Sequence, residues 1–424
     1  MALRTYGYER ELLGRITLSR KPWIGPKWVS SPFNFKSSVL KQFNFPKKLQ
    51  LYDVTCRDGE QRPGVVFRKE DKIAIAKKLD EVGIQRIEAG MPAVSEDDFN
   101  AVREIAHSGL NADVVAFSRA RKEDIDLALK CDVWGVLIET PSSDELITKG
   151  FGWTRQKMFK MATEATAYAK DHGLHTTYFA VDSTRADPAF LKKMYTSVVK
   201  ESRVDSVVVV DTFGVASPQG MSEIVSSVKR WVRVPLEVHC HNDFSFGTAN
   251  AIAGLAAGAS VAHTNVNGIG ERAGGASTEE VAVALRILYG KDLGFKYEKL
   301  CELSRLVQEA SGLPVSPQKP VVGETAFGYE AGIAVMFCHN LKKANALQYG
   351  LSYMPEFVGN KFYVAIGKKS GAHSIRWRLE DLGIEASDEQ VDKILAEVKQ
   401  EAIQKKRGLT DEEFLTIVKK FELG

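Results

Sequence analysis

The chain has 424 residues, a formal net charge of +3, 44% apolar residues and 26% charged residues. These values are ordinary for a soluble globular protein, and no stretch approaches the roughly 18 apolar residues of a membrane span. Five cysteines without paired spacing favour a reducing cytoplasm over a disulfide framework.

Residues 1–48 are basic, with ten Lys/Arg against Glu9 and Glu11. Such a start is compatible with a targeting peptide. However, many aromatic residues and the prolines Pro22, Pro26 and Pro32 interrupt any targeting helix. We therefore expect an ordered strap that packs on the body of the protein or on a partner subunit. Because no basic clusters continue into the body, nucleic-acid binding is not expected.

From residue 49 onward, short β-rich runs alternate with amphipathic helical segments. The runs are Leu49–Asp53, Arg86–Ala89, Asp113–Phe117, Trp134–Glu139, Thr176–Val181, Ser206–Asp211, Leu236–His239 and Ala262–Val266. Eight strands that alternate with helices predict an α/β fold, a closed (β/α)8 TIM barrel. An open doubly wound sheet is the structural alternative.

After residue 292 the alternation stops. A helical pattern over Tyr297–Ser311, a Pro/Gly-punctuated stretch over Pro314–Gly332 and charged helices then follow to the end of the chain. We interpret Glu380–Leu423 as a solvated pair of helices. The predicted domains are a strap over 1–48, a catalytic barrel over 49–292 and small helical C-terminal subdomains over 293–424.

Functional residues in a barrel collect at the C-terminal ends of strands. Three such ends are unusually polar: Asp53–Gly64, Glu237–Asp243 and Asn265–Gly275. His239 and His241 lie two residues apart on one strand, so both imidazoles face the barrel interior. With a carboxylate from another strand, for which Asp58 is the candidate, they could hold a divalent metal with open positions. The alternative is a pair of hydrogen-bonded structural histidines.

Two further residues at strand ends suggest substrate chemistry. Arg57 is always charged and could stabilise the oxyanion that forms when a ketone is attacked; otherwise it is a surface salt bridge. Thr212 ends the sixth strand with a hydroxyl suited to a carboxylate or carbonyl oxygen. Its alternative role is a helix N-cap.

The motifs at these strand ends carry a family resemblance. They are Asp53-x-Thr55-x-Arg57-Asp58-Gly59-Glu60-Gln61-x-Pro63-Gly64, Asp211-Thr212-x-Gly214, His239-x-His241-Asn242-Asp243 and Gly268-Ile269-Gly270-Glu271-Arg272-Ala273-Gly274. Together they resemble the pyruvate-carboxyltransferase-type (DRE-TIM) barrels, which comprise isopropylmalate, homocitrate and citramalate synthases, with hydroxymethylglutaryl-CoA lyase as a cousin. The Gly-Glu-Arg segment resembles the synthases, and the Cys-Pro loop of the lyases is absent.

The resemblance implies an acyltransferase that condenses an acyl-CoA, acetyl-CoA first, with a 2-oxo acid to give a 2-hydroxy-dicarboxylic acid in amino-acid biosynthesis. A divalent metal (Zn, Mg or Mn) held by Asp58, His239 and His241 would chelate the oxo acid. The implied catalytic residues are Arg57, Glu271, Tyr329 and His339, and the implied substrate-binding residues are Gln61, Glu88, Thr212 and Arg185. The implied partners are small-molecule substrates and a second copy in a cytoplasmic homodimer, without nucleic acid or membrane.

The chain departs from the family pattern at three places. Gly275 stands where synthases commonly carry a metal-ligating Asn, although the homocitrate branch also lacks it. Val181 replaces a Glu, which suggests a different oxo-acid side chain or a changed proton route. Tyr329 and Ala334 replace two histidines, one of them catalytic, so the enolising base must come from elsewhere, with Tyr329, Glu330 and His339 as candidates.

Two other functions remain open at this stage. A lyase or aldolase of the hydroxymethylglutaryl-CoA lyase type would use the same metal barrel for carbon–carbon cleavage. A binding protein that kept the barrel and the metal would show no turnover with any oxo acid.

Overall fold

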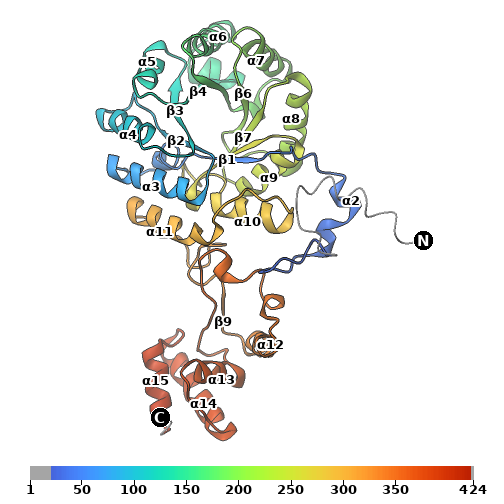
Figure 1. Cartoon of the computed structure of the whole chain (residues 1–424), viewed down its shortest axis with the longest axis vertical. Coiled ribbons are helices and arrows are strands. Elements are labelled where there is room, and N and C mark those ends of the chain that lie inside the picture. Colours follow the sequence, from blue (N-terminus) through green and yellow to red (C-terminus); the bar gives the residue numbers. More distant parts are fainter. Residues whose placement is uncertain (1–20, 422–424) are drawn as a thin grey trace, which may run out of the picture. The chain divides into compact units, whose positions relative to one another are not determined.

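The computed structural model describes residues 21–421, which form two compact units (Figure 1). The first unit contains residues 32–315, and the second contains residues 23–31 together with the described part of 316–424. Each is described by itself below. The three-part division expected from the sequence (1–48, 49–292 and 293–424) stays a prediction.

The first unit is built on a closed barrel of eight parallel strands in chain order, which confirms the predicted TIM barrel. The strands are β1 (Gln50–Asp53), β2 (Arg86–Gly90), β3 (Asp113–Arg119), β4 (Gly135–Pro141), β5 (His175–Val181), β6 (Ser206–Asp211), β7 (Leu236–Cys240) and β8 (Val261–Thr264). Closure comes from β1 pairing with β8, in the register Tyr52 with His263. The barrel therefore exposes no strand edge.

Helices follow the strands and surround the barrel (Figure 1). They are α3 (Lys69–Val82), α4 (Glu96–Ala106), α5 (Lys122–Lys130), α6 (Arg155–Asp171), α7 (Pro188–Lys200), α8 (Pro218–Trp231), α9 (Gly247–Ala257), α10 (Thr278–Leu288) and α11 (Leu300–Ser311). Two of them, α7 and α8, begin on an N-cap side chain followed by proline: in α8, Ser217 accepts from the Gly220 N–H and Pro218 opens the helix. These caps end each connecting loop sharply and fix where it leaves the strand.

The barrel interior is apolar in its middle. Val54, Phe117, Leu137, Phe179 and Val210 belong to one buried cluster, contributed by alternate residues of their strands or of the turn after β1. Because successive side chains on a strand point to opposite faces, membership of this cluster identifies which residues of each strand face inward.

Below this cluster lies a buried ionic network. Arg86 on β2 donates to Glu237 on β7 at 2.8 Å, and the second oxygen of Glu237 lies 2.8 Å from Nε2 of His263 on β8. Burial raises the pKa of Glu237, but Arg86 and His263 outweigh that effect and lower it to about 2. The network ties three strands together near the start of the barrel.

The second unit has its own core. Its elements are β9 (Gly328–Tyr329), α12 (Gly332–Lys343), β10 (Tyr363–Val364), α13 (Ala372–Asp381), α14 (Asp388–Lys405) and α15 (Asp411–Lys419). Capping boxes start α14 at Ser387 and α15 at Thr410. The interpretation of the tail as merely solvated helices is wrong in one respect: α14 and α15 bury Ile394, Val398 and Phe414 in a shared cluster.

The predicted strap can be followed only from residue 21, because residues 1–20 lie outside the described part of the chain. Trp28 is buried in the second unit, with its ring 5.3 Å from that of Phe357. In the first unit, Phe43 and Phe45 both pack edge-on against Tyr289. Trp28, Phe43 and Phe45 thus pack on the body of the protein, whereas Phe33 is exposed.

We predict that Glu237→Ala lowers the free energy of unfolding by about 3–5 kcal/mol, because it leaves the buried Arg86 charge without a partner. Urea unfolding monitored by circular dichroism measures this. The folded pKa of Glu237 lies below the unfolded value of about 4.3. Its contribution is therefore present above that unfolded value and is lost as the pH falls toward 2.

Glu164→Ala is the matched control, since Glu164 makes an exposed ion pair with Lys160 on α6. We expect its unfolding curve to overlay that of the wild type. An equal loss in both variants would show that the buried network contributes nothing special.

Candidate metal centre and active site

Asp58, His239 and His241 converge at the C-terminal end of the barrel. One ligand atom from each lies within 4.8 Å of the others, and all three side chains are buried. Nε2 of His239 lies 3.2 Å from Nε2 of His241, which in turn lies 3.9 Å from Oδ1 of Asp58. One carboxylate and two imidazoles with nitrogens this close form a donor set that suits a divalent metal.

The hydrogen bond that His241 makes with the backbone fits metal binding. Nδ1 of His241 lies 3.1 Å from the Gly274 carbonyl oxygen, which can only accept, so the proton is on Nδ1 and the lone pair is on Nε2. Nδ1 of His239 is buried and, among the described residues, lacks the outer-shell partner that a metal-bound histidine commonly has. Burial, followed by the neighbouring His241, holds the pKa of His239 well below its ordinary value, so this imidazole is neutral.

Arg57 lies beside the metal ligands and is fixed on three sides. Its Nε donates to Glu88, and its Nη1 donates to Gln61 at 3.1 Å and to Asp58 at 3.4 Å. The guanidinium stacks on the Phe117 ring, 4.2 Å from its centroid. Its Nη2 is buried and has no partner among the described residues.

The charge of Arg57 is stabilised by its neighbours. Burial would lower its pKa, but Glu88 and then Asp58 raise it above its ordinary value. Glu88 also accepts from the Tyr52 hydroxyl at 2.9 Å, so both of its oxygens are engaged within the protein. The structure thus places Glu88 and Gln61, two predicted substrate-binding residues, as groups that hold Arg57.

Thr212 and Arg185 lie on the neighbouring side of the barrel. The Thr212 hydroxyl accepts from the backbone N–H of Asp182 at 2.8 Å and keeps its own proton to donate. Arg185 forms an ion pair with Asp182 at 2.8 Å and stacks 4.1 Å from the Phe213 ring centroid. Substrate binding by both residues stays a prediction.

The remaining predicted catalytic residues have the following partners. Glu271 is half-exposed and lies 3.4 Å from Arg272. In the second unit, the Tyr329 hydroxyl donates to the Gly350 carbonyl oxygen, and burial raises its pKa. His339, also in the second unit, is buried, with Nε2 2.9 Å from Glu380. Their catalytic roles are not tested by this geometry.

Asn265, just after β8, is a residue that the sequence analysis did not single out. Its Nδ2 donates to Oδ2 of Asp58 at 3.0 Å, which leaves Oδ1 turned toward His241. A Cβ atom at Gly275 would lie 2.4 Å from Oδ1 of Asn265, so this side chain needs glycine at position 275. The loop after β8 therefore supports the ligands from behind, through Asn265 and Gly274, as outer-shell groups do in metal sites.

Glu139 on β4 was also missed. Burial raises its pKa to about 7, with Arg57 opposing the shift and Glu88 adding to it. It makes no hydrogen bond or ion pair with other described residues. A carboxylate at a strand end was visible in the sequence, but nothing there showed that it faces the same space as Arg57.

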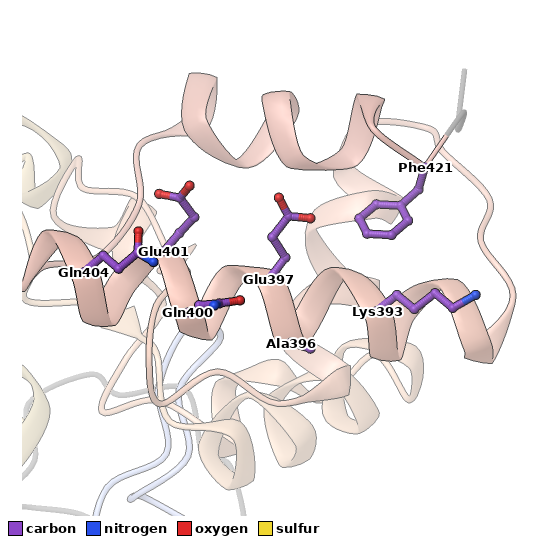
Figure 2. A pocket seen from close by; sticks show the side chains of 7 residues that line it. All are labelled: Lys393, Ala396, Glu397, Gln400, Glu401, Gln404 and Phe421. Carbon is purple, nitrogen blue, oxygen red and sulfur yellow. The ribbon is translucent and has the colours of Figure 1, made fainter.

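A hollow of about 510 Å³ in the second unit does not carry this chemistry (Figure 2). It lies along α14, and Phe421 closes one side. Its lining residues are Lys393, Ala396, Glu397, Gln400, Glu401, Gln404 and Phe421. Because no imidazole or thiol is among them, we assign no catalytic site to it.

Comparison with known proteins gives two family matches. The HMGL-like family matches residues 48–307, which span the barrel. The homocitrate synthase post-HMGL domain-like family matches residues 321–406.

Relatives with assigned names are similar along most of the chain. Homocitrate synthase AksA of Methanothermobacter thermautotrophicus is 42% identical over 393 residues, covering 93% of this chain and 98% of the relative. (R)-citramalate synthase CimA of Methanocaldococcus jannaschii is 43% identical over 352 residues, covering 83% and 70%. A probable 2-isopropylmalate synthase of Methanopyrus kandleri is 43% identical over 356 residues, covering 84% and 70%.

Among solved structures, the HMG-CoA lyase of Bacillus subtilis aligns with a TM-score of 0.58 at 19% identity, over 64% of this chain and 96% of the lyase. At this identity the likeness shows the barrel fold alone.

We predict that Asp58→Ala and His241→Ala each abolish binding of a divalent metal, because each removes a ligand atom. Metal per protein after gel filtration, measured by atomic emission, tests this. Asn265→Ala should keep the metal but weaken its affinity by about 10–100-fold, since it releases Asp58 from its outer-shell partner.

A double-mutant cycle tests the role of Gly275. Gly275→Ala should lower the affinity for the metal as much as Asn265→Ala does, because the added Cβ displaces the Asn265 amide. In the Asn265→Ala background, Gly275→Ala should cost nothing further. Full additivity of the two changes would show that Gly275 acts independently of Asn265.

Proposed function

The chain belongs to the HMGL-like family and is an acyltransferase related to the homocitrate, citramalate and isopropylmalate synthases, and on this premise we propose how its barrel joins an acyl-CoA to a 2-oxo acid. The acyl donor is acetyl-CoA. The product is a 2-hydroxy-dicarboxylic acid. The observation that carries the proposal is the free Nη2 of Arg57 beside three converging metal ligands.

Arg57 binds the carbonyl oxygen of the oxo acid. Its Nη2 offers a buried N–H that no group in the described part of the chain accepts, while Glu88 and Gln61 fix the plane of the guanidinium. As the carbonyl carbon is attacked, negative charge grows on this oxygen, and a preorganised donor stabilises that charge more than it stabilises the ketone. The hydroxyl of Thr212 donates a hydrogen bond to the carboxylate of the same substrate.

Asp58, His239 and His241 hold a divalent ion, for which Zn, Mg and Mn all suit the donor set. When bound, the ion supplies Lewis acidity and orientation to the oxo acid. Asn265 and Gly274 keep the ligand atoms turned toward it.

The overall reaction balances in three changes. The acetyl methyl group loses a proton, and its carbon bonds to the carbonyl carbon of the oxo acid. The carbonyl oxygen gains a proton and becomes the tertiary hydroxyl. Water then cleaves the thioester, so that the thiol of CoA leaves and a second carboxylate remains, which drives the condensation forward.

The enolising base is proposed among Tyr329, His339 and Glu330, with Glu271 as a further catalytic residue. Glu330 accepts from the backbone N–H of Lys369 at 2.9 Å. The substrates are small molecules, and we propose a homodimer without nucleic-acid or membrane partners.

We also propose a cytoplasmic location, which the five buried free cysteines support. No helix in the described part of the chain has the length and apolar character needed to cross a membrane.

Carbon–carbon cleavage is not supported as the main activity. The extensive relatives at 42–43% identity are named as synthases, whereas the lyase likeness rests on the shared fold. A non-catalytic binding role has no specific support, since Arg57 and all three candidate ligands are in place.

We predict that the metal-loaded protein releases one free thiol per product when acetyl-CoA meets the correct 2-oxo acid. A thiol-reactive dye with a panel of oxo acids and mass spectrometry of the product measures this. Cleavage of a hydroxy acid with no condensation would contradict the proposal.

Arg57→Lys should lower kcat by at least about 100-fold while metal affinity stays near the wild-type value. An ammonium cannot copy the fork that bonds Glu88, Gln61 and the substrate oxygen together. Near-normal turnover in this variant would show that Arg57 has no catalytic role.

A further inference from the structure

The order of strands around the closed barrel decides where the side chain of the oxo acid must lie. The metal ligands follow β1 or lie on and just after β7, and Thr212 follows β6. If the carbonyl and the carboxylate of the substrate face these strands, its side chain faces the opposite wall. That wall is formed by β3, β4 and β5, which are consecutive in the barrel.

This wall is mostly apolar. The rings of Phe117 on β3 and Phe179 on β5 pack edge-on, with centroids 6.4 Å apart. Val181, two residues beyond Phe179, packs against the same interior cluster. Arg57 lies over the Phe117 ring, so the wall begins directly beside the proposed reaction centre.

Glu139 is a polar residue in this wall, next to Arg119 on β3. It pairs in register with Arg119 on β3 and with Phe179 on β5. Leu137, two residues earlier, belongs to the interior cluster, so Glu139 points to the same inner face. Arg57 stacks on Phe117 of the neighbouring strand β3, so Glu139 and Arg57 face the same interior wall.

The nearby cations are already engaged. Arg119 donates to both oxygens of Asp124, at 2.7 and 3.0 Å. Arg57 is held by Glu88, and its one free nitrogen is assigned to the carbonyl oxygen. A second carboxylate on the substrate would therefore meet Glu139 without a free cation to receive it, whereas a hydrogen-bond donor there would give Glu139 the partner that it lacks.

We propose that Glu139 determines the choice of oxo acid, selecting a side chain that is apolar along its length and ends in a hydrogen-bond donor, such as a hydroxyl, and rejecting a side chain that ends in a carboxylate. This inference rests on the proposed function for its placement of the substrate. It assigns the substrate class that the names of the relatives leave open.

Three oxo acids of matched length test the proposal: 4-hydroxy-2-oxobutanoate, its methyl isostere 2-oxopentanoate and the dianion 2-oxoglutarate. Calorimetric titration of the metal-loaded protein gives a dissociation constant for each acid, and thiol release with acetyl-CoA gives kcat/KM. The wild type should favour the hydroxyl acid over the other two by at least about 10-fold in both measurements.

Glu139→Leu should reverse the order of the hydroxyl acid and 2-oxopentanoate, because the donor would lose its acceptor in an apolar wall. Above the pKa of Glu139, which burial raises to about 7, Glu139→Gln should strengthen binding of 2-oxoglutarate at least about 10-fold, since it removes the ionised carboxylate and keeps the side-chain volume. Metal affinity should not change in either variant. Glu145→Gln removes an exposed carboxylate a few residues away and should leave all three constants unchanged.

The outcomes separate this inference from the proposed function. If the three oxo acids bind in the predicted order of affinity but no thiol is released, the condensation reaction is contradicted and the role of Glu139 in binding stands. If thiol is released but neither variant changes the order of preference among the three oxo acids, the role of Glu139 is contradicted and the condensation reaction stands. Tightest wild-type binding of 2-oxoglutarate, or no binding of any of the three acids, would overturn the substrate class. Should the leucine variant not fold, the glutamine variant decides alone.

Discussion

Arg57 places a positive charge inside the barrel, and much of the active end is arranged to hold that charge. A buried guanidinium without partners would be very costly, so Glu88, Gln61 and Asp58 surround it, and Phe117 stacks beneath it. Tyr52 in turn holds Glu88. One nitrogen, Nη2, is left over. The same contacts that make burial tolerable therefore aim a single donor at the space in front of the metal ligands.

The barrel interior has polar layers above and below an apolar middle. The lower network of Arg86, Glu237 and His263 ties three strands together and engages both oxygens of Glu237, while Nε of Arg86 and Nδ1 of His263 have no partner among the described residues. The upper layer holds groups without partners, including Nη2 of Arg57 and Nδ1 of His239. Unsatisfied buried groups reduce stability, and they concentrate at functional sites. The three converging candidate metal ligands beside Nη2 of Arg57 distinguish the upper layer and locate the reaction at the C-terminal end of the barrel.

The loop after β8 shows how a small change in sequence can be absorbed. Glycine at position 275 leaves room for the Asn265 amide, which donates to Asp58. The carbonyl oxygen of Gly274 accepts from Nδ1 of His241 and so orients its ring. The same short segment therefore orients one ligand through a side chain and another through a carbonyl oxygen. On the opposite wall, Glu139 lies among mostly apolar neighbours. Its carboxylate therefore indicates the kind of oxo-acid side chain that the barrel accepts.

The sequence by itself determined the eight strands, because the alternation of β-rich and helical segments is a local property of the chain. It also placed Asp58, His239 and His241 at strand ends, since the period of two on a strand fixes which side chains share a face. Only the tertiary structure showed that Asn265 reaches Asp58 from 207 residues away, and that Arg57 stacks on Phe117 beside the strand that carries Glu139. Tertiary packing also turned the charged C-terminal helices into a core. Strand periodicity depends on neighbouring residues, whereas contacts across a closed barrel depend on strand register and side-chain direction, which a single sequence does not carry.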